Sequence, residues 1–553
     1  MSTPTPTHRP LHAVPRGLLT GLVLLALAYA WLSLGAIARH APWYRNADMN
    51  IINVVDALCL NSGLAPAIVD QPAAPTKFFL ALDYRVRNAL GLLPVWHAKR
   101  FARSPDPLRE YASLVQIGRE QSRVLVFALI VLAAGFAGHA ARSYEAGCLA
   151  ALLLSGSSGL LFHGLLVRPE LWCVAFGGVL ALYTAWLASH ARTPAGRARW
   201  LLLAGLAVGL GALAKLPGLA YGLLVVAWSA LSTLLPPDPA SARPAAAPAW
   251  RWTIASALAA GIGTLGLLLW LASHAAPLDP VGASRARLTA LVVALLPLAG
   301  LIPVRSRLSE YARGRLLDLA LLLAGALLSL GLWFALVRIT LPAPAAADYL
   351  TKILNAVFYP DLLLKIFTQP GEVHRLHEMG RFFLETPALF ASTTALVLAL
   401  LFWPGVPRRT QALVLVLFLQ ALGVVALLSQ REFLDHFSLF AQVPLLLCWP
   451  IALTAWHRTW CAHQPVTEHR WPGLLALTAA GLLALLHPAE LRFKYHRYQA
   501  EPVGSVDVAT ITFLYDHPDH PTPFVAALKA RYPTREAFTA ALHEFLREPA
   551  RHP

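Results

Sequence analysis

Charged residues are scarce in this chain. Asp, Glu, Lys and Arg make up 13% of its 553 residues, whereas soluble proteins carry roughly 25%. Hydrophobic residues reach 57% and the mean hydropathy is +0.56, which is more apolar surface than a soluble fold buries. This composition excludes a disordered chain and a coiled coil, and it predicts an all-α polytopic membrane protein.

Cysteine and acidic residues are also few. No two of the five cysteines show metal-ligand spacing, and four stand in or beside apolar runs, so a secreted disulfide scaffold is excluded. The 45 Lys and Arg outnumber the 29 acids and give a formal net charge of +16. Most of these basic residues are arginines in short loops, a pattern typical of membrane topology rather than of nucleic-acid binding.

Long apolar runs dominate the sequence instead. A helix needs about 20 apolar residues to cross a bilayer, and thirteen runs come close to this length. The predicted spans are 17–38, 123–141, 147–167, 170–189, 200–216, 218–236, 252–273, 288–304, 317–338, 386–404, 411–429, 437–456 and 472–487. Pro217-Gly218 predicts a tight turn between the fifth and sixth of them.

The distribution of arginine predicts the topology. Residues 1–16 carry Arg9 and Arg16 without an acid, so we expect this tail to be cytoplasmic. Alternation through a transmembrane domain at 17–487 then leaves loops 39–122 and 339–385, and a small tail at 488–553, on the outer side. Arg285 and Arg287 break the pattern in one outer loop. In the tail, Thr534 is predicted to cap a helix.

The long first outer loop contains the most specific pattern. Asp48 precedes an apolar-periodic stretch that stops at Asn61-Ser62-Gly63, which predicts a short surface helix with Asp48 at or near its N-cap. A turn containing Asp70 and two prolines follows, and then a second interfacial helix. Helix capping alone is a sufficient explanation for Asp48.

Several motifs together resemble a known family. They are the loop just described, Arg168-Pro169-Glu170 before an aliphatic helix, the stretch around Lys215, and Asp435-His436-Phe437 before a late span. In order and spacing they resemble the GT-C glycosyltransferases, in particular the bacterial branch that is similar to dolichyl-phosphate-mannose protein mannosyltransferases. The sequence departs from the pattern of this family at two points. Met49 follows Asp48 where many members have a second acid, and Asp70-Gln71-Pro72 stands where many members have His-Pro-Pro.

This resemblance implies a GT-C-like fold and transfer of a sugar from a polyprenyl-phosphate donor to a lipid, glycan or protein acceptor at the outer face of a bacterial inner membrane. It implies that a carboxylate takes the acceptor proton; Asp48 is the first candidate and Asp70 the reserve. Cations at the outer ends of spans would hold the donor phosphate. The candidates are Arg168, Lys215 and Arg431, with snorkelling to headgroups as the alternative for Lys215.

Supporting residues complete the prediction. Glu170 beside Arg168 is either an acceptor contact or an ion pair, and His436 is either an orienting group or a plain loop residue. His374 and His377 have helical spacing with Glu378, but acceptor or lipid contact is favoured over a metal, so no cofactor is predicted. Two other functions stay open, namely a transporter or lipid flippase, and an inactive protein with the same fold.

Overall fold

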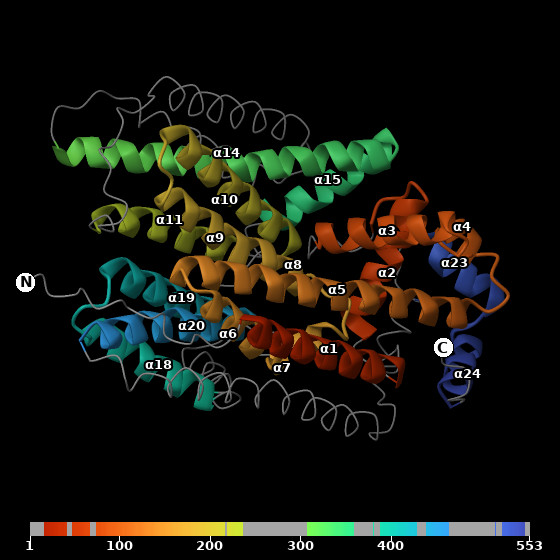
Figure 1. Cartoon of the computed structure of the whole chain (residues 1–553). Helices are drawn as coiled ribbons and strands as arrows, with labels where there is room; N and C mark the ends of the chain where they lie inside the picture. The colour runs from red at the N-terminus through yellow and green to blue at the C-terminus, as the bar shows by residue number, and fades with distance from the viewer. Residues whose placement is uncertain are drawn as a thin grey trace, which may run out of the picture.

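The computed structural model describes residues 16–40, 47–66, 73–215, 218–235, 307–358, 380, 387–428, 438–463, 515 and 522–547. Throughout these ranges the regular structure is helical, as the composition predicts. The predicted spans 252–273, 288–304 and 472–487 lie outside the described residues. Most of the long helices run along a common direction in one bundle (Figure 1).

The helices have the following bounds: α1 Arg16–His40, α2 Ala47–Asn61, α3 Ala74–Ala89, α4 Ala98–Phe101, α5 Pro107–Ala141, α6 Tyr144–Ser155, α7 Ser158–His163, α8 Glu170–Trp172, the π-helix η1 Cys173–Leu180, α9 Ala181–Ser189, α10 Pro194–Ala214, α11 Gly218–Leu234, α14 Arg307–Thr340, α15 Ala343–Phe358, α18 Pro387–Phe402, α19 Arg408–Leu428, α20 Ser438–His463, α23 Thr522–Arg531 and α24 Arg535–Arg547.

Among the described residues, seven helical stretches are long and apolar enough to cross a membrane: Arg16–Ala38, Pro107–Ala141, Glu170–His190, Pro194–Ala214, Gly314–Thr340, Arg408–Ala426 and Leu439–Thr459. Each overlaps a predicted span. Three further predicted spans correspond to shorter apolar helices, at Tyr144–Ser155, Ala220–Leu234 and Ala388–Phe402. The fold is therefore that of an all-α polytopic membrane protein.

Two predicted spans differ from the structure. The span predicted to start at 123 belongs to α5, a helix of 35 residues that extends about 50 Å at 1.5 Å per residue, beyond the ~30 Å hydrocarbon core. Asp106 starts it early, because its side chain accepts a hydrogen bond from Arg109 N. The span predicted at 147–167 is broken after Ser155, where Ser157 caps the new helix α7 by accepting from Leu160 N.

Small residues bring α10 and α14 unusually close. A Cβ atom built on Gly205 would lie 2.0 Å from the carbonyl oxygen of Leu322, and one on Gly325 would lie 2.0 Å from that of Leu202. Gly205 and Gly209 are four residues apart on α10, a spacing typical of tightly packed membrane helices. The contact therefore requires glycine at these positions.

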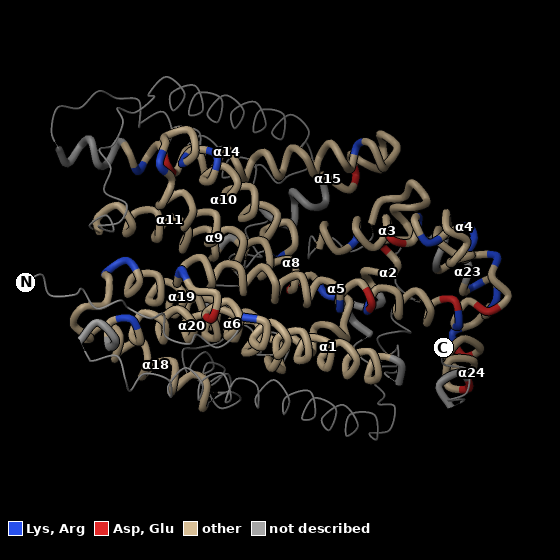
Figure 2. Tube along the Cα trace, in the orientation of Figure 1, with Lys and Arg blue, Asp and Glu red and all other residues tan. Residues whose placement is uncertain are grey.

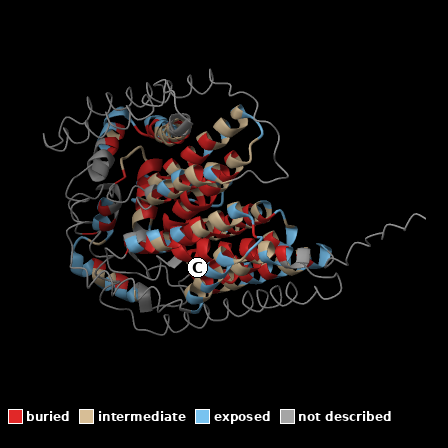
Figure 3. Ribbon diagram, turned by 90° about the vertical axis from the view of Figure 1, so that its left-hand side faces the viewer, coloured by how far each residue is buried: buried red, intermediate tan, exposed pale blue. Residues whose placement is uncertain are grey.

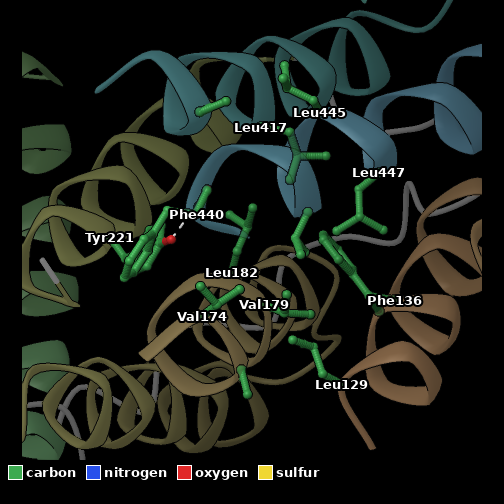
Figure 4. Packing of buried hydrophobic residues seen from close by; sticks show 14 of the residues in the cluster. Leu129, Phe136, Val174, Val179, Leu182, Tyr221, Leu417, Phe440, Leu445 and Leu447 are labelled. Atoms are coloured by element: carbon green, nitrogen blue, oxygen red, sulfur yellow. Dashed lines mark hydrogen bonds between the residues drawn. The ribbon is translucent and has the colours of Figure 1, made fainter. Parts of the chain in front are cut away.

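The apolar core fills the centre of the bundle. Buried residues line the inward faces of the helices, while exposed positions follow the outer faces (Figure 3). In the middle, Tyr221 of α11 and Phe440 of α20 meet with ring centroids 6.3 Å apart, and Leu182, Leu417 and Leu445 belong to the same cluster (Figure 4). This core holds the ends of the spans in fixed positions.

A layer of short helices covers one end of the bundle. It consists of α2, α3 and α4, with α23 packed against α4, and we call it the end layer (Figure 1). The predicted surface helix after Asp48 is α2, which begins at Ala47, and the predicted second helix is α3. In α24, Ala537 N donates to Thr534 Oγ1 at 3.2 Å, so the predicted N-cap is confirmed.

Candidate functional site

The end layer is fastened to the ends of the membrane helices by backbone contacts. On α2, Asn53 Nδ2 donates to the carbonyl oxygen of Val167 at 2.8 Å. At the start of α3, Ala73 N donates to the carbonyl oxygen of Ala214 at 3.1 Å. Val167 and Ala214 are the immediate neighbours of Arg168 and Lys215, so α2 and α3 lie directly over these two predicted cations.

Glu170 joins the two predicted cations. The Lys215 ammonium pairs with Glu170 Oε1, and Arg168 Nη1 lies 3.8 Å from the same oxygen. Glu170 is fully buried and Arg168 is 6% exposed. The predicted ion pair of Arg168 with Glu170 is therefore present, and it is shared with a lysine 45 positions further along the chain.

A sharp chain reversal positions Lys215. The helix α10 ends at Ala214, Lys215 is extended with φ −157° and ψ 141°, and Gly218 N donates to its carbonyl oxygen at 2.8 Å. A Cβ atom on Gly218 would lie 2.4 Å from the carbonyl carbon of Gly211, so only glycine fits. This confirms the predicted tight turn and explains why Lys215 projects at a helix end.

A second buried ion pair lies within the end layer. Lys77 Nζ is 2.8 Å from Asp56 Oδ2, and both side chains are only 1% exposed. Asp56 lies one turn beyond Asn53 on α2, and Lys77 lies in the first turn of α3. Since Asn53 and Ala73 contact the residues beside Arg168 and Lys215, the two ionic groups occupy one region. We call this region the ionic site.

Several buried polar atoms of this region have no hydrogen-bond partner in the described part of the chain. They are Asn53 Oδ1, Thr76 Oγ1, Arg168 Nε and Tyr349 Oη. Native proteins leave few such groups, and each one needs a hydrogen-bond partner. Three of the four can donate a hydrogen bond. A ligand with several acceptor oxygens would satisfy these three donors, whereas Asn53 Oδ1 needs a donor.

Tyr349 of α15 contributes through its hydroxyl. Burial raises the pKa of this phenol well above its usual value, and the negative charge of Asp56 raises it further. The hydroxyl therefore remains protonated, and it can act as a hydrogen-bond donor at every physiological pH.

The ionic site is suited to an anion. Three cations, Lys77, Arg168 and Lys215, meet two carboxylates, Asp56 and Glu170. Glu170 pairs with two of these cations, Arg168 and Lys215. The hydroxyl groups of Thr76 and Tyr349 are further hydrogen-bond donors of the region. Among the described residues no group of three His, Cys, Asp or Glu side chains could hold a metal ion. The excess of cations over carboxylates favours direct binding of an anionic group.

The other predicted site residues have different positions. Asp48 is the second residue of α2, in the first turn of the helix that carries Asn53 and Asp56. Asp70, Arg431, His436, His374 and His377 lie outside the described residues. The structure therefore brings Arg168, Glu170 and Lys215 together and puts the helix of Asp48 beside them.

Comparison with known proteins gives little at the sequence level. No family model matches the chain, and no curated protein matches it. Among solved structures it is similar to ArnT from Cupriavidus metallidurans bound to undecaprenyl phosphate, at 15% identity and a TM-score of 0.37, over 96% of this chain and 78% of ArnT. It is also similar to ArnT in the apo state, at 15% identity and a TM-score of 0.24, over 91% and 92% of the two chains. Both TM-scores are too low for either likeness to enter the argument on function.

Lys77 and Asp56 are site residues that the sequence analysis missed. Asp56 interrupts an otherwise apolar stretch of α2, between Val55 and Ala57, and all three are buried. A carboxylate at such a position requires a partner, which is a signal for a buried ion pair. The sequence does not identify Lys77 as that partner, because it stands 21 positions away on a different helix.

Proposed function

We propose that this protein is an integral-membrane glycosyltransferase that moves a sugar from a polyprenyl-phosphate donor to a hydroxyl acceptor. The observation that carries the proposal is the ionic site: buried cations and hydrogen-bond donors gathered where the end layer meets the ends of the membrane helices. A polyprenyl phosphate has its anionic group at the membrane surface and its chain in the bilayer. It therefore matches a cationic site at the end of an apolar bundle.

The cations of the site would bind the donor phosphate. Arg168 offers a planar fork of donors to phosphate oxygens, and Lys77 and Lys215 offer point charges. As the sugar departs, negative charge builds up on the lipid phosphate, and fixed cations in a water-poor site stabilise it. Glu170 would act as a support that holds Lys215 and Arg168 in place.

Asp48 is the proposed general base. The acceptor oxygen forms a bond to the anomeric carbon, the bond from that carbon to the phosphate oxygen breaks, and the acceptor proton passes to the Asp48 carboxylate. The electron pair of the broken bond leaves with the polyprenyl phosphate. Asp48 belongs to the first turn of α2, and helix N-termini in general favour negatively charged groups.

Transfer assays with purified protein test this function. The protein receives a radiolabelled polyprenyl-phosphate sugar and a mixed pool of lipid, glycan and protein acceptors. Labelled product or donor hydrolysis supports the proposal. Movement of the labelled lipid from one leaflet of a vesicle to the other, without sugar transfer or donor hydrolysis, would instead identify a flippase. Absence of reaction and of movement would identify an inactive protein.

Asp48→Asn tests the base. Asparagine keeps the shape of the side chain but cannot take the proton, so turnover should fall at least about 10²-fold, the low end of the effect of general-base catalysis. Asp83→Asn, in a half-buried ion pair on α3, is the matched control and should stay near the parent rate. If Asp48→Asn also keeps the parent rate, Asp48 serves only as a helix-terminal acid.

A further inference from the structure

A lateral groove opens near the end of the bundle that lies away from the end layer. Its volume is about 900 Å³, and its walls come from α1, α5, α6 and α9. Val23, Leu27, Ile130, Val131 and Leu187 supply aliphatic side chains. Val131 is 64% exposed, so the groove faces outward from the bundle rather than into the core.

One end of this groove is polar and cationic. Arg142 and Ser143 lie between α5 and α6, and both line the groove. Arg458 Nη2 donates to the carbonyl oxygen of Arg142 at 2.8 Å, which brings a second exposed arginine to the same end. Glu145 is the nearby acid, and it lies within electrostatic reach of Arg16 and Arg458. Two arginines thus act on this one carboxylate, and Arg142 adds a third cation at the same end of the groove.

Aromatic and imidazole groups mark the boundary between the two parts. The rings of Trp186 and His190 are 4.3 Å apart, and His139 Nδ1 is hydrogen-bonded to Tyr183 Oη. Trp186, His139 and His190 all line the groove. Amphipathic rings of this kind prefer the level of lipid headgroups in a membrane.

We infer that this groove is a binding site for one anionic phospholipid, with an acyl chain along α5 and the phosphate at Arg142. Because α1, α5 and the η1–α9 segment are membrane-spanning, the apolar part of the groove faces lipid chains rather than water. The arginines complement a negatively charged headgroup. This site is separate from the ionic site, because Val167, the neighbour of Arg168, lies against Gly118 of α5, whereas the groove uses residues 130–139 of that helix. It does not depend on the proposed function.

Gly135 offers a way to fill the groove without disturbing the fold. It lines the groove, and a Cβ atom built on it meets nothing within 4 Å. Gly135→Leu therefore places a side chain where the acyl chain would lie. Gly331 on α14 also has open space around its Cβ and does not line the groove, so Gly331→Leu is the matched control.

Native mass spectrometry of the purified, delipidated chain measures the binding. Phosphatidylglycerol and phosphatidylcholine with the same acyl chains are added separately. The parent and Gly331→Leu should retain one phosphatidylglycerol in preference to phosphatidylcholine. Gly135→Leu should bind it at least about tenfold more weakly, because each displaced methylene costs packing contacts. Arg142→Gln should keep lipid binding but lose roughly fivefold of the preference for the anionic lipid, the contribution of one basic residue.

Three results would overturn the inference. They are equal binding of both lipids by the parent, unchanged binding by Gly135→Leu, and an unchanged preference in Arg142→Gln. Polyprenyl phosphate serves as a competitor. If it displaces phosphatidylglycerol from the parent, and Gly135→Leu abolishes its binding, the groove holds a polyprenyl chain and the assignment to a phospholipid is wrong.

Discussion

The buried pair of Lys77 and Asp56 provides the sharpest test of the site. Its two side chains are 1% exposed and 2.8 Å apart. Removing one partner leaves a buried charge without its counter-ion, which costs about 3–5 kcal/mol, whereas replacing both by neutral groups is often close to neutral. Lys77→Met and Asp56→Asn should therefore each destabilise the protein strongly, and the double variant should be more stable than either single variant.

A second ion pair in the end layer supplies the matched control. Arg87 Nε lies 3.0 Å from Asp83 Oδ1, with side chains 30% and 24% exposed. Exposed pairs four residues apart on a helix contribute only about 0.3–0.5 kcal/mol. Both double-mutant cycles are measured by urea denaturation in the same detergent. The coupling energy should be about 2–3 kcal/mol for the buried pair, at the top of the usual range for residues in contact, and several-fold smaller for the more accessible pair of Asp83 and Arg87.

Donor binding separates the structural role of the pair from its functional role. The double variant Asp56→Asn/Lys77→Met regains stability but lacks a cation of the ionic site, so its affinity for polyprenyl phosphate should remain below that of the parent. Equal coupling energies in the two cycles would refute the energetic argument. Parent-like affinity in the stable double variant would remove Lys77 from the donor site.

Two further predictions concern packing and pH. Gly205→Ala places a methyl group 2.0 Å from the carbonyl oxygen of Leu322, so it should cost at least about 1–3 kcal/mol through overpacking and lower the Tm in detergent, whereas Gly331→Ala, with open space around it, should not. Burial, and then Arg100 and its neighbours Lys99 and Arg103, lower the pKa of His97, which accepts a hydrogen bond from Arg100 N as the N-cap of α4. Because the folded chain binds this proton less readily than the unfolded chain, stability is full above the ordinary histidine pKa of about 6.5 and is lost as pH falls through the lower folded value. His97→Asn keeps a capping oxygen without titrating, so its Tm should fall less than that of the parent between about pH 7 and 5, a range that contains the ordinary histidine pKa. Tm curves that run parallel over this range would contradict the prediction.

Local patterns predicted the helices well. Apolar runs gave the positions of α1, α10, α14, α19 and α20, since hydropathy over about 20 residues is a local property. The cap of α24 at Thr534 was predicted because Thr before a helical stretch has a local physical role. The start of α5 was missed, because its first four turns are polar enough to be taken for a loop, although Asp106-Pro107 is a helix-start signal.

The pairing of charges could not be predicted in the same way. Basic residues line both ends of the bundle (Figure 2), and nothing local distinguishes a lysine that pairs from one that reaches the headgroups. Lys215 and Glu170 meet because α10 packs against η1 through Gly211 and Gly177, where a Cβ atom on Gly211 would lie 2.7 Å from Gly177 N. Such a contact depends on how whole helices cross.

The shared use of Glu170 gives this pairing a chemical consequence. A lysine paired with a carboxylate of its own would have to break that ion pair before it could bind a phosphate. The cost of breaking the pair would offset much of the binding free energy. Here Lys215 and Arg168 share one carboxylate, so the group retains positive charge while Glu170 stays in place. In the proposed role, a donor phosphate would be held by these two cations while Glu170 keeps them in position. Glu170→Gln would remove that support, and the two cations would repel each other, which is why we assign Glu170 to positioning rather than to chemistry.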